Sequence, residues 1–356
     1  MNARRTAALI LAAATLMALN AGAYAENAPD IAAGGAALIE QHTGAVICAK
    51  EAHKKLPMAS TTKIMTALIV IENCQLGDTV KVSPKAYGVE GSSMYLNAGE
   101  EVSVEDMLYG LMLLSGNDAA VALAIHTAGS VEAFAALMNA RAEEIGSHNT
   151  NFVTPNRLHD PEHYTTAYDL ALIAAEAMKN PDFRKIVGST YHKTTTGSVI
   201  RYMKNKNKIL WQYEGGCGVK TGFTKAAGRC LVFAAERDGM RVVGAALNCP
   251  NWFEEAADIM DYGFETYSMV EVLPEGSVLT EGKERFTLLS ALRVPVREGE
   301  TADTEIESNE RGERVWAVVN GERVVCAPLL REKETRKPGF IEVFRTLWMR
   351  WSAFNI

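Results

Sequence analysis

The sequence lacks the short motifs that hold metals and cofactors. It has no Cys-x-x-Cys pair, and its seven histidines show no metal-ligand spacing. It also has no phosphate-cradling glycine loop and no dinucleotide fingerprint. We therefore expect the protein to need no metal and no cofactor.

The sequence also lacks an excess of positive charge. It lacks the Gly-x-Ser-x-Gly motif that forms a nucleophile elbow as well. The formal net charge of -7 argues against a nucleic-acid partner, because general nucleic-acid binders carry a basic patch. Without the elbow, an α/β-hydrolase nucleophile is not indicated, although a Ser/His/Asp triad on another fold stays open.

Six cysteines are present, but they are widely spread: Cys48, Cys74, Cys217, Cys230, Cys249 and Cys326. Most lie in apolar, strand-like runs such as AVICAK and RVVCAPLL, where a free cysteine behaves as a small buried hydrophobe. Three disulfides are the alternative, and the sequence leaves their state open.

The N-terminal hydrophobic run predicts a secretory signal. Arg4 and Arg5 precede TAALILAAATLMALNAGAYA, and Ala23-Tyr24-Ala25 has the small-x-small form of a cleavage site. We expect a signal peptide over residues 1–25 and an exported protein on the outer face of the cytoplasmic membrane. A membrane helix that stays attached is the alternative.

Changes of periodicity predict two folded domains after the signal. Residues 29–268 show a strand pair, then helices, then strands and a last helix, which favours an α+β domain with a mainly antiparallel sheet. Residues 270–335 show short β-type runs and an Asn-Gly hairpin signal, which favour a small β domain.

Local signals in the first domain predict where elements begin and turn. We expect hairpins at His42-Thr43-Gly44 and at Arg237-Asp238-Gly239. Helical signal dominates from Ser60 to about Gly146, with Ser103 as a helix N-cap. Thr166 and Asp169 are placed like a capping box.

Residues 337–356 predict an amphipathic helix that rests on a membrane surface. Its apolar side chains recur at helical spacing: Phe340, Val343, Phe344, Leu347, Trp348 and Trp351. The segment is too short and too charged to span a bilayer, but its tryptophans and arginines suit the interface. A helix that packs on the protein body is the alternative.

Three polar motifs follow one another in the first domain. They are Ser60-Thr61-Thr62-Lys63, Ser115-Gly116-Asn117 and Lys220-Thr221-Gly222. Each alone has a plain structural interpretation: a helix cap with an outward lysine, a helix end recapped by Asn117 or Asp118, and a solvated edge-strand lysine. Their order and apolar surroundings make the set specific.

The first motif has the chemistry of a nucleophile and its base. Ser60 and Lys63 are three residues apart, so on a helix they share one face. A serine hydroxyl attacks only when a base takes its proton, and a lysine is that base only when neutral. Burial and a neighbouring cation such as Lys220 lower a lysine pKa. Helix N-terminal amides could supply half of an oxyanion hole.

The three motifs resemble those of the penicillin-recognising serine enzymes, with their S-x-x-K, S-D-N and K-T-G elements. The resemblance is closest to the low-molecular-mass penicillin-binding proteins, the D-alanyl-D-alanine carboxypeptidases, and covers most of residues 30–268. It also extends to flanking segments such as PMASTTKIMTALIVIE and GVKTGFTKAAGRCLVFAAERDGMRVVGAAL. It implies a β-lactamase/transpeptidase-like fold and a peptidoglycan stem peptide ending in D-Ala-D-Ala as substrate.

The resemblance implies catalytic roles for Ser60, Lys63, Ser115 and Asn117. Ser60 attacks the carbonyl between the last two D-alanines, and Lys63 takes its proton. Ser115 helps to pass a proton to the departing D-alanine, and Asn117 orients the substrate amide and Lys63. Penicillins and other β-lactams would acylate Ser60.

The resemblance also implies a substrate-binding strand. Lys220 and Thr221 hold the terminal carboxylate, Gly222 lets the backbone approach closely, and the amides of Ser60 and Phe223 bind the oxyanion.

Arg157 departs from the family pattern, which usually has glycine there; a turn is altered or the arginine reaches the substrate.

Two rival functions stay open. A class A β-lactamase would need a deacylating glutamate, and the only candidate, Glu162, lacks the expected Glu-x-x-x-Asn context. A non-enzymatic wall-binding scaffold is disfavoured because all the motif side chains are present.

Overall fold

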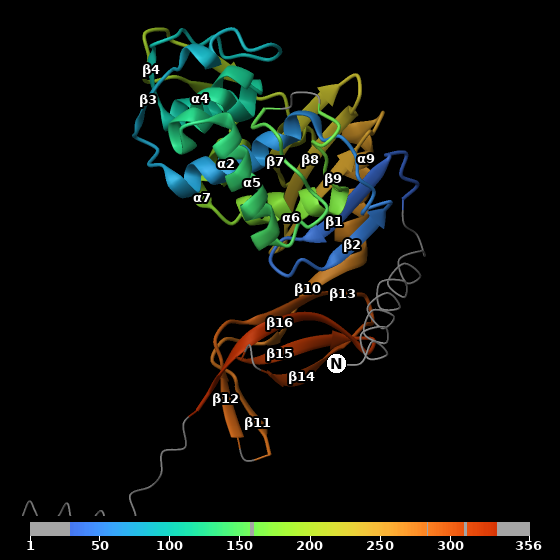
Figure 1. Cartoon of the computed structure of the whole chain (residues 1–356). Coiled ribbons are helices and arrows are strands. Elements are labelled where there is room, and N and C mark those ends of the chain that lie inside the picture. The colour runs from blue at the N-terminus through green and yellow to red at the C-terminus, as the bar shows by residue number, and fades with distance from the viewer. Residues whose placement is uncertain (1–28, 157–159, 283, 310–311, 333–356) are drawn as a thin grey trace, which may run out of the picture. The chain divides into compact units, whose positions relative to one another are not determined.

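The chain forms two compact units, which Figure 1 shows in a computed structural model. The structure describes residues 29–156, 160–282, 284–309 and 312–332. The first unit runs to Met269 and includes Pro295–Glu300, and the second comprises Val270–Val294 and the chain from Thr301. The predicted signal peptide, the predicted C-terminal helix and Arg157 lie outside the described residues.

A five-stranded antiparallel sheet with the order β2-β1-β9-β8-β7 forms the centre of the first unit. Its strands are β1 Gly35–Glu40, β2 Val46–Lys50, β7 Gly216–Thr224, β8 Gly228–Arg237 and β9 Met240–Leu247. The predicted hairpins are confirmed: β1 pairs with β2, and β8 turns into β9 through Asp238 and Gly239, both at positive φ. The edge strands in this order are β2 and β7.

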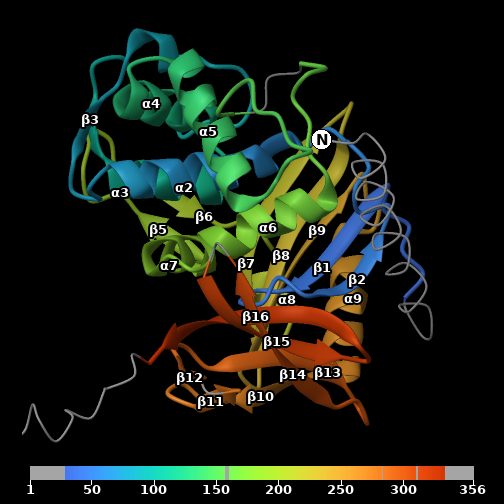
Figure 2. The same cartoon turned by 60° about the horizontal axis from the view of Figure 1, so that its bottom comes forward.

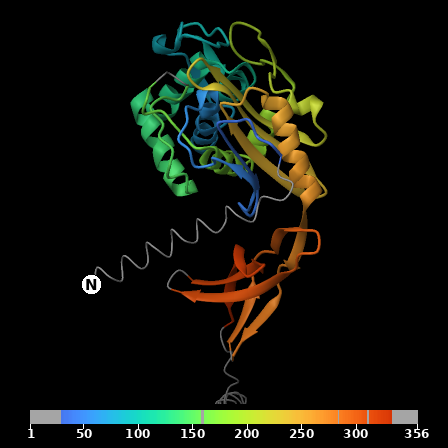
Figure 3. The ribbon, with the colours of Figure 1, turned by 90° about the vertical axis from the view of Figure 1, so that its right-hand side faces the viewer.

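Helices cover both faces of this sheet, with α6 and α2 on one face and α9 on the other (Figure 3). The helices of the first unit are α2 Lys63–Asn73, α3 Val104–Tyr109, α4 Asn117–Ala128, α5 Val131–Ile145, α6 Ala167–Ala177, α7 Pro181–Gly188, α8 Ile209–Gln212 and α9 Trp252–Thr266. Alternation along β8 separates two cores: Val232 packs with the α2 and α6 side, and Phe233 packs with α9.

The helical region from Ser60 to Gly146 is less continuous than the sequence predicts. Short strands β3 Thr79–Lys81 and β4 Glu101–Ser103 pair within it, and 3-10 turns form at Ala59–Thr62 and Pro84–Ala86. Ser103 caps α3 as predicted. The capping box is only half right, because the Asp169 carboxylate bonds Asn149 and Thr150 instead of turning back to Thr166.

The described part of the second unit is all β. Its five-stranded sheet has the order β11-β12-β16-β15-β14, with bounds Val278–Glu281, Glu284–Leu288, Glu322–Arg331, Gly312–Val319 and Ala302–Asn309. The Asn-Gly hairpin is confirmed, with Asn320 and Gly321 both at positive φ between β15 and β16. Strand β10 Tyr267–Leu273 pairs with β13 Leu292–Arg297, and in the first unit β5 Tyr191–Lys193 pairs with β6 Tyr202–Lys204 (Figure 2).

All six cysteines are free thiols. Within the described ranges no single helix is long and apolar enough to cross a membrane, although α4 and α5, bent by 83°, pass that test as a pair by length and composition.

A buried ion pair ties together two segments of the first unit that are distant in sequence. Arg201 donates to both oxygens of Glu100 at 2.8 Å, and also to the carbonyls of Met94 and Tyr95. Both side chains are less than one-tenth exposed. Burial alone would raise the pKa of Glu100, but its bonds to Arg201 lower it below the ordinary value.

We expect Arg201→Ala to lower the free energy of unfolding by about 3–5 kcal/mol, because it leaves a buried carboxylate unpaired. Lys185→Ala, which breaks the exposed pair with Glu105, should cost no more than about 1 kcal/mol. Urea unfolding of both variants measures this, and equal losses would contradict the structural role of the buried pair.

Candidate active site

Ser60 and Lys63 lie at the junction between a 3-10 turn and α2. The turn Ala59–Thr62 carries Ser60, and α2 begins at Lys63, so the two side chains share one face. Lys63 is fully buried and Ser60 is 5% exposed. Lys63 Nζ lies 3.2 Å from Ser60 Oγ, which is hydrogen-bond distance for proton transfer.

Two further acceptors fix the Lys63 amine. Its Nζ donates to Asn117 Oδ1 at 2.7 Å and to the Asn156 carbonyl at 3.0 Å. The Asn117 amide is itself oriented, because its Nδ2 donates to the Glu90 carbonyl at 2.5 Å. These polar contacts therefore hold the Lys63 amine inside the protein, and the side chain does not reach solvent.

Ser115 is held in a strained position beside Asn117. The π-helical segment Gly110–Leu114 ends at Ser115, which adopts the left-handed conformation with φ 64° before α4 begins at Asn117. Its Oγ is buried and has no hydrogen-bond partner among the described residues. Strain and an unpaired buried hydroxyl each cost about 1–3 kcal/mol, and such costs gather at functional sites.

The loop before this turn is fastened by Asp118. Its carboxylate accepts from Ser93 Oγ at 2.6 Å and from the amides of Met94 and Leu96 at 3.0 Å. The Asn117 amide N–H donates to the Ser92 carbonyl. Asp118 is thus a positioning residue, which the sequence offered only as a possible helix cap.

Edge strand β7 lies directly against the Ser60 turn. A Cβ at Gly222 would lie 3.0 Å from the Ser60 amide nitrogen and 3.2 Å from that of Thr61. Glycine at this position therefore permits the close approach that the sequence predicts. Thr221 is buried beside it, whereas the Phe223 side chain is 55% exposed.

Lys220 is buried on the same strand. Its Nζ donates to the Thr221 carbonyl at 3.0 Å. Burial, with a smaller effect from the charge of Lys206, lowers the pKa of Lys220 to about 7. The sequence predicts that Lys220 supplies a positive charge, but with a pKa of about 7 this lysine is only partly protonated near neutral pH.

His163 supports the turn that carries Ser60, a role that the sequence does not reveal. Its Nδ1 accepts the Val153 amide N–H at 3.0 Å, so the neutral ring places its proton on Nε2. Nε2 then donates to Thr62 Oγ1 at 2.8 Å, and Thr62 donates to the Ala59 carbonyl. Burial lowers the pKa of His163 to about 4.

These groups form a buried polar cluster built from four separate stretches of chain, with a serine and a lysine in contact at its centre. A family model described as D-alanyl-D-alanine carboxypeptidase matches residues 22–251. The chain belongs to the D-alanyl-D-alanine carboxypeptidase family. This confirms the family that the three motifs predict.

Individual carboxypeptidases of this family match over most of their length. The chain is 30% identical over 351 residues to D-alanyl-D-alanine carboxypeptidase DacF of Bacillus subtilis, with 90% of each chain covered. It is 39% identical over 290 residues to the D-alanyl-D-alanine carboxypeptidase of Streptomyces sp. strain K15, covering 74% of this chain and 99% of that one.

Solved structures of carboxypeptidase relatives share the fold. Penicillin binding protein 5 from Haemophilus influenzae has a TM-score of 0.76 at 26% identity, covering 86% of this chain and 98% of its own. The Streptomyces K15 DD-transpeptidase has a TM-score of 0.63 at 39% identity, covering 67% and 99%. The predicted α+β transpeptidase-like fold and the class of serine D-Ala-D-Ala carboxypeptidase, a penicillin-binding hydrolase, are confirmed.

We expect Gly222→Val to lower the rate of acylation by fluorescent penicillin by about 100-fold or more, because a side chain here displaces the Ser60 backbone. Gly77→Val is the matched control, since a Cβ there meets no atom within 4 Å. An unchanged acylation rate in Gly222→Val would contradict the close approach of β7.

We expect His163 to make the folded state sensitive to acid. Its pKa of about 4 lies below the ordinary value of about 6.5, so its stabilising contribution is complete above about pH 6.5 and is lost as the pH falls toward 4. The loss is on the order of 3 kcal/mol.

Urea unfolding at pH 7 and pH 4.5 measures this contribution. The difference in free energy of unfolding should shrink in His163→Gln and stay as in the wild type in His126→Gln, which changes an exposed histidine. Equal pH dependence in all three proteins would show that His163 is not the source.

Proposed function

We propose that the chain removes the terminal D-alanine from peptidoglycan stem peptides through an acyl-enzyme on Ser60. The observation that carries this assignment is the buried Lys63 amine, 3.2 Å from Ser60 Oγ. The D-alanyl-D-alanine carboxypeptidase names of relatives from Bacillus, Streptomyces and other bacteria support the same substrate.

Acylation begins when Lys63 takes the proton from Ser60 Oγ. The oxygen bonds to the carbonyl carbon between the two D-alanines, and the oxyanion rests between the amides of Ser60 and Phe223. Ser115 relays this proton to the leaving nitrogen, giving its own proton and receiving the one held by Lys63; the C–N bond breaks, D-alanine departs, and Lys63 is neutral again. The unpaired, buried Oγ of Ser115 supports this role, because a substrate amine would give it a partner.

Substrate binding falls to Asn117 and to strand β7. The Asn117 amide, already oriented through Glu90, faces Lys63 and would hold the substrate amide beside it. Lys220 and Thr221 bind the terminal carboxylate. A bound carboxylate favours the charged form of Lys220, so binding raises its pKa from about 7 and protonates it.

Deacylation uses water and the same lysine. Lys63 deprotonates the water, whose oxygen attacks the ester carbonyl; the bond to Ser60 Oγ breaks, and Lys63 returns the proton to that oxygen. Glu162 does not support a class A β-lactamase mechanism, because the residue is exposed. Its backbone N–H donates to the Asp160 carboxylate. Penicillins would therefore leave a long-lived acyl-enzyme.

The place of action is the outer face of the cytoplasmic membrane. This part of the proposal rests on the sequence of residues 1–25 and 337–356, which have the patterns of a secretory signal and of an interfacial helix.

A pentapeptide ending in D-Ala-D-Ala tests the chemistry. We expect wild type to release free D-alanine, Ser60→Ala to release none, and Lys63→Ala to lower kcat/KM by about 1000-fold or more. Lys81→Ala, at an exposed position, should keep the wild-type rate.

The outcomes separate the claims. No D-alanine from wild-type protein would refute the carboxypeptidase assignment, and a wild-type rate in Lys63→Ala would refute the base. Rapid, repeated nitrocefin turnover would favour a β-lactamase.

A further inference from the structure

One stretch of the first unit has a charge opposite to that of the chain. No acidic residue lies between Asp182 and Glu214, although the whole chain carries a net charge of -7. Seven basic residues lie in this interval: Arg184, Lys185, Lys193, Arg201, Lys204, Lys206 and Lys208. Lys185 and Arg201 pair with carboxylates elsewhere in the unit, and the other five form no salt bridge with a described residue. Such segregation of charge is unexpected in an acidic protein unless a surface serves an anionic partner.

The lysines of this stretch share one exposed face. From Tyr202 to Lys208, exposed residues alternate with buried ones, so Lys204, Lys206 and Lys208 all reach solvent while Met203, Asn205 and Asn207 do not. This is the alternation of an extended chain.

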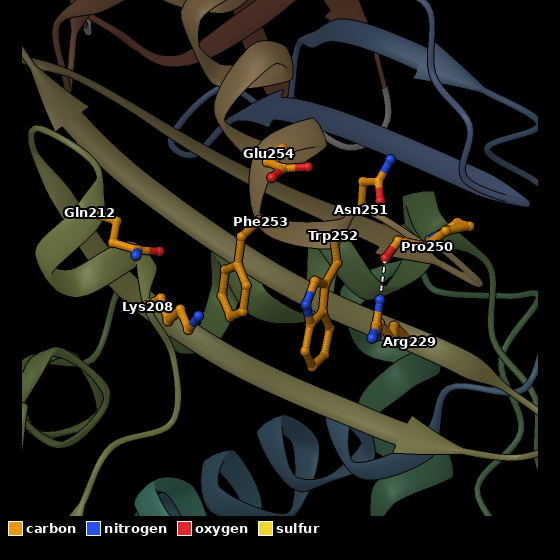
Figure 4. Close-up of a pocket in the computed structure, with 8 residues that line it drawn as sticks. All are labelled: Lys208, Gln212, Arg229, Pro250, Asn251, Trp252, Phe253 and Glu254. Atoms are coloured by element: carbon orange, nitrogen blue, oxygen red, sulfur yellow. Dashed lines mark hydrogen bonds between the residues drawn. The ribbon is translucent and has the colours of Figure 1, made fainter.

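Aromatic rings accompany the cations and continue the surface across α9 (Figure 4). Lys204 Nζ lies 5.9 Å from the Trp211 ring, and Lys208 Nζ lies 5.8 Å from the Phe253 ring. Beyond them, the Arg229 guanidinium lies 5.9 Å from the ring of Trp252. We call Lys204, Lys206, Lys208, Phe253, Trp252 and Arg229 the basic strip.

The far end of the basic strip is hollowed. Lys208, Arg229 and the two α9 rings line a pocket of about 320 Å³, and its other lining residues are Gln212, Pro250, Asn251 and one acidic residue, Glu254. In Figure 4 the rings of Phe253 and Trp252 hang side by side between Lys208 and Arg229. Arg229 is anchored here by a bond to the Pro250 carbonyl.

The charges of the basic strip are available to a ligand. Among the described residues, no carboxylate forms a salt bridge with its four cations, which are all exposed. The strip also reaches the catalytic site, because Lys206 Nζ donates to the carbonyl of Leu114, the residue before Ser115. The same lysine contributes to the low pKa of Lys220.

We propose that the basic strip binds the carboxylate-bearing strands of polymeric peptidoglycan outside the catalytic site. The carboxylates of neighbouring stem peptides pair with the lysines and Arg229, and sugar rings lie on the aromatic faces of Phe253 and Trp252. The inference rests on the proposed function for its choice of polymer. Its consequence is a preference for polymeric substrate over short peptides.

Binding is measured with full-length Ser60→Ala protein on purified insoluble peptidoglycan, so that turnover does not enter. In this background, Lys204→Gln/Lys208→Gln should weaken retention about three- to tenfold, as expected for the loss of two exposed ion pairs, and should flatten its salt dependence. Lys81→Gln/Lys85→Gln, which removes the same charge from exposed positions elsewhere in the unit, should change nothing.

Chemistry of the wall polymer identifies the ligand. Peptidoglycan stripped of phosphate polymers should bind as well as before, and peptidoglycan whose carboxylates have been amidated should bind weakly. Undiminished binding to amidated wall, or loss of binding with the phosphate polymers, would overturn the proposal.

Kinetics with Ser60 intact completes the test. Lys204→Gln/Lys208→Gln should lower kcat/KM on polymeric substrate and leave that on a short pentapeptide unchanged. A parallel fall on both substrates would overturn the proposal of a separate surface. Failure of wild type to release D-alanine would refute the proposed function alone, because retention of Ser60→Ala is measured without catalysis.

Discussion

The burial of one amine organises the catalytic half of this structure. Lys63 has no exposed surface, so its Nζ needs polar partners on every side, and it finds them in Ser60, Asn117 and Asn156. An unpaired buried amine would cost several kcal/mol, so the three partners must stay in place for the domain to be stable. The hydrogen bonds that Lys63 Nζ requires thus bring together the turn that carries Ser60, the start of α4 and the loop before residue 157.

Much of this arrangement can be predicted from residues that are close together in the sequence. The spacing of Ser60 and Lys63 places them on one helical face, and the segment GRCLVFAAER predicts a strand, which the structure buries on both faces. Turn chemistry at Asp238-Gly239 and Asn320-Gly321 fixes two hairpins. These features depend on residues close together in the chain, so their physics can be evaluated without knowing the fold.

Other parts depend on partners that sequence cannot place. The Asn156 carbonyl meets Lys63 and the His163 ring meets Thr62 only because a loop about 90 to 100 residues downstream folds back on α2. A main-chain carbonyl has no sequence signature, and a lone histidine in a polar loop has many possible roles. The broken helical region has the same origin, since the pairing of β3 with β4 is a tertiary contact.

The π-helical segment Gly110–Leu114 limits how the length of the chain can change during evolution. Its wider turn closes through the backbone N–H of Ser115, which donates to the Gly110 carbonyl, and it sets the rotation at which Ser115 leaves the helix. Loss of a single residue here would restore regular α-helix and turn Ser115 by about 100° away from Lys63. Exposed loops can gain or lose residues during evolution, but this segment is expected to keep its length even where its side chains vary.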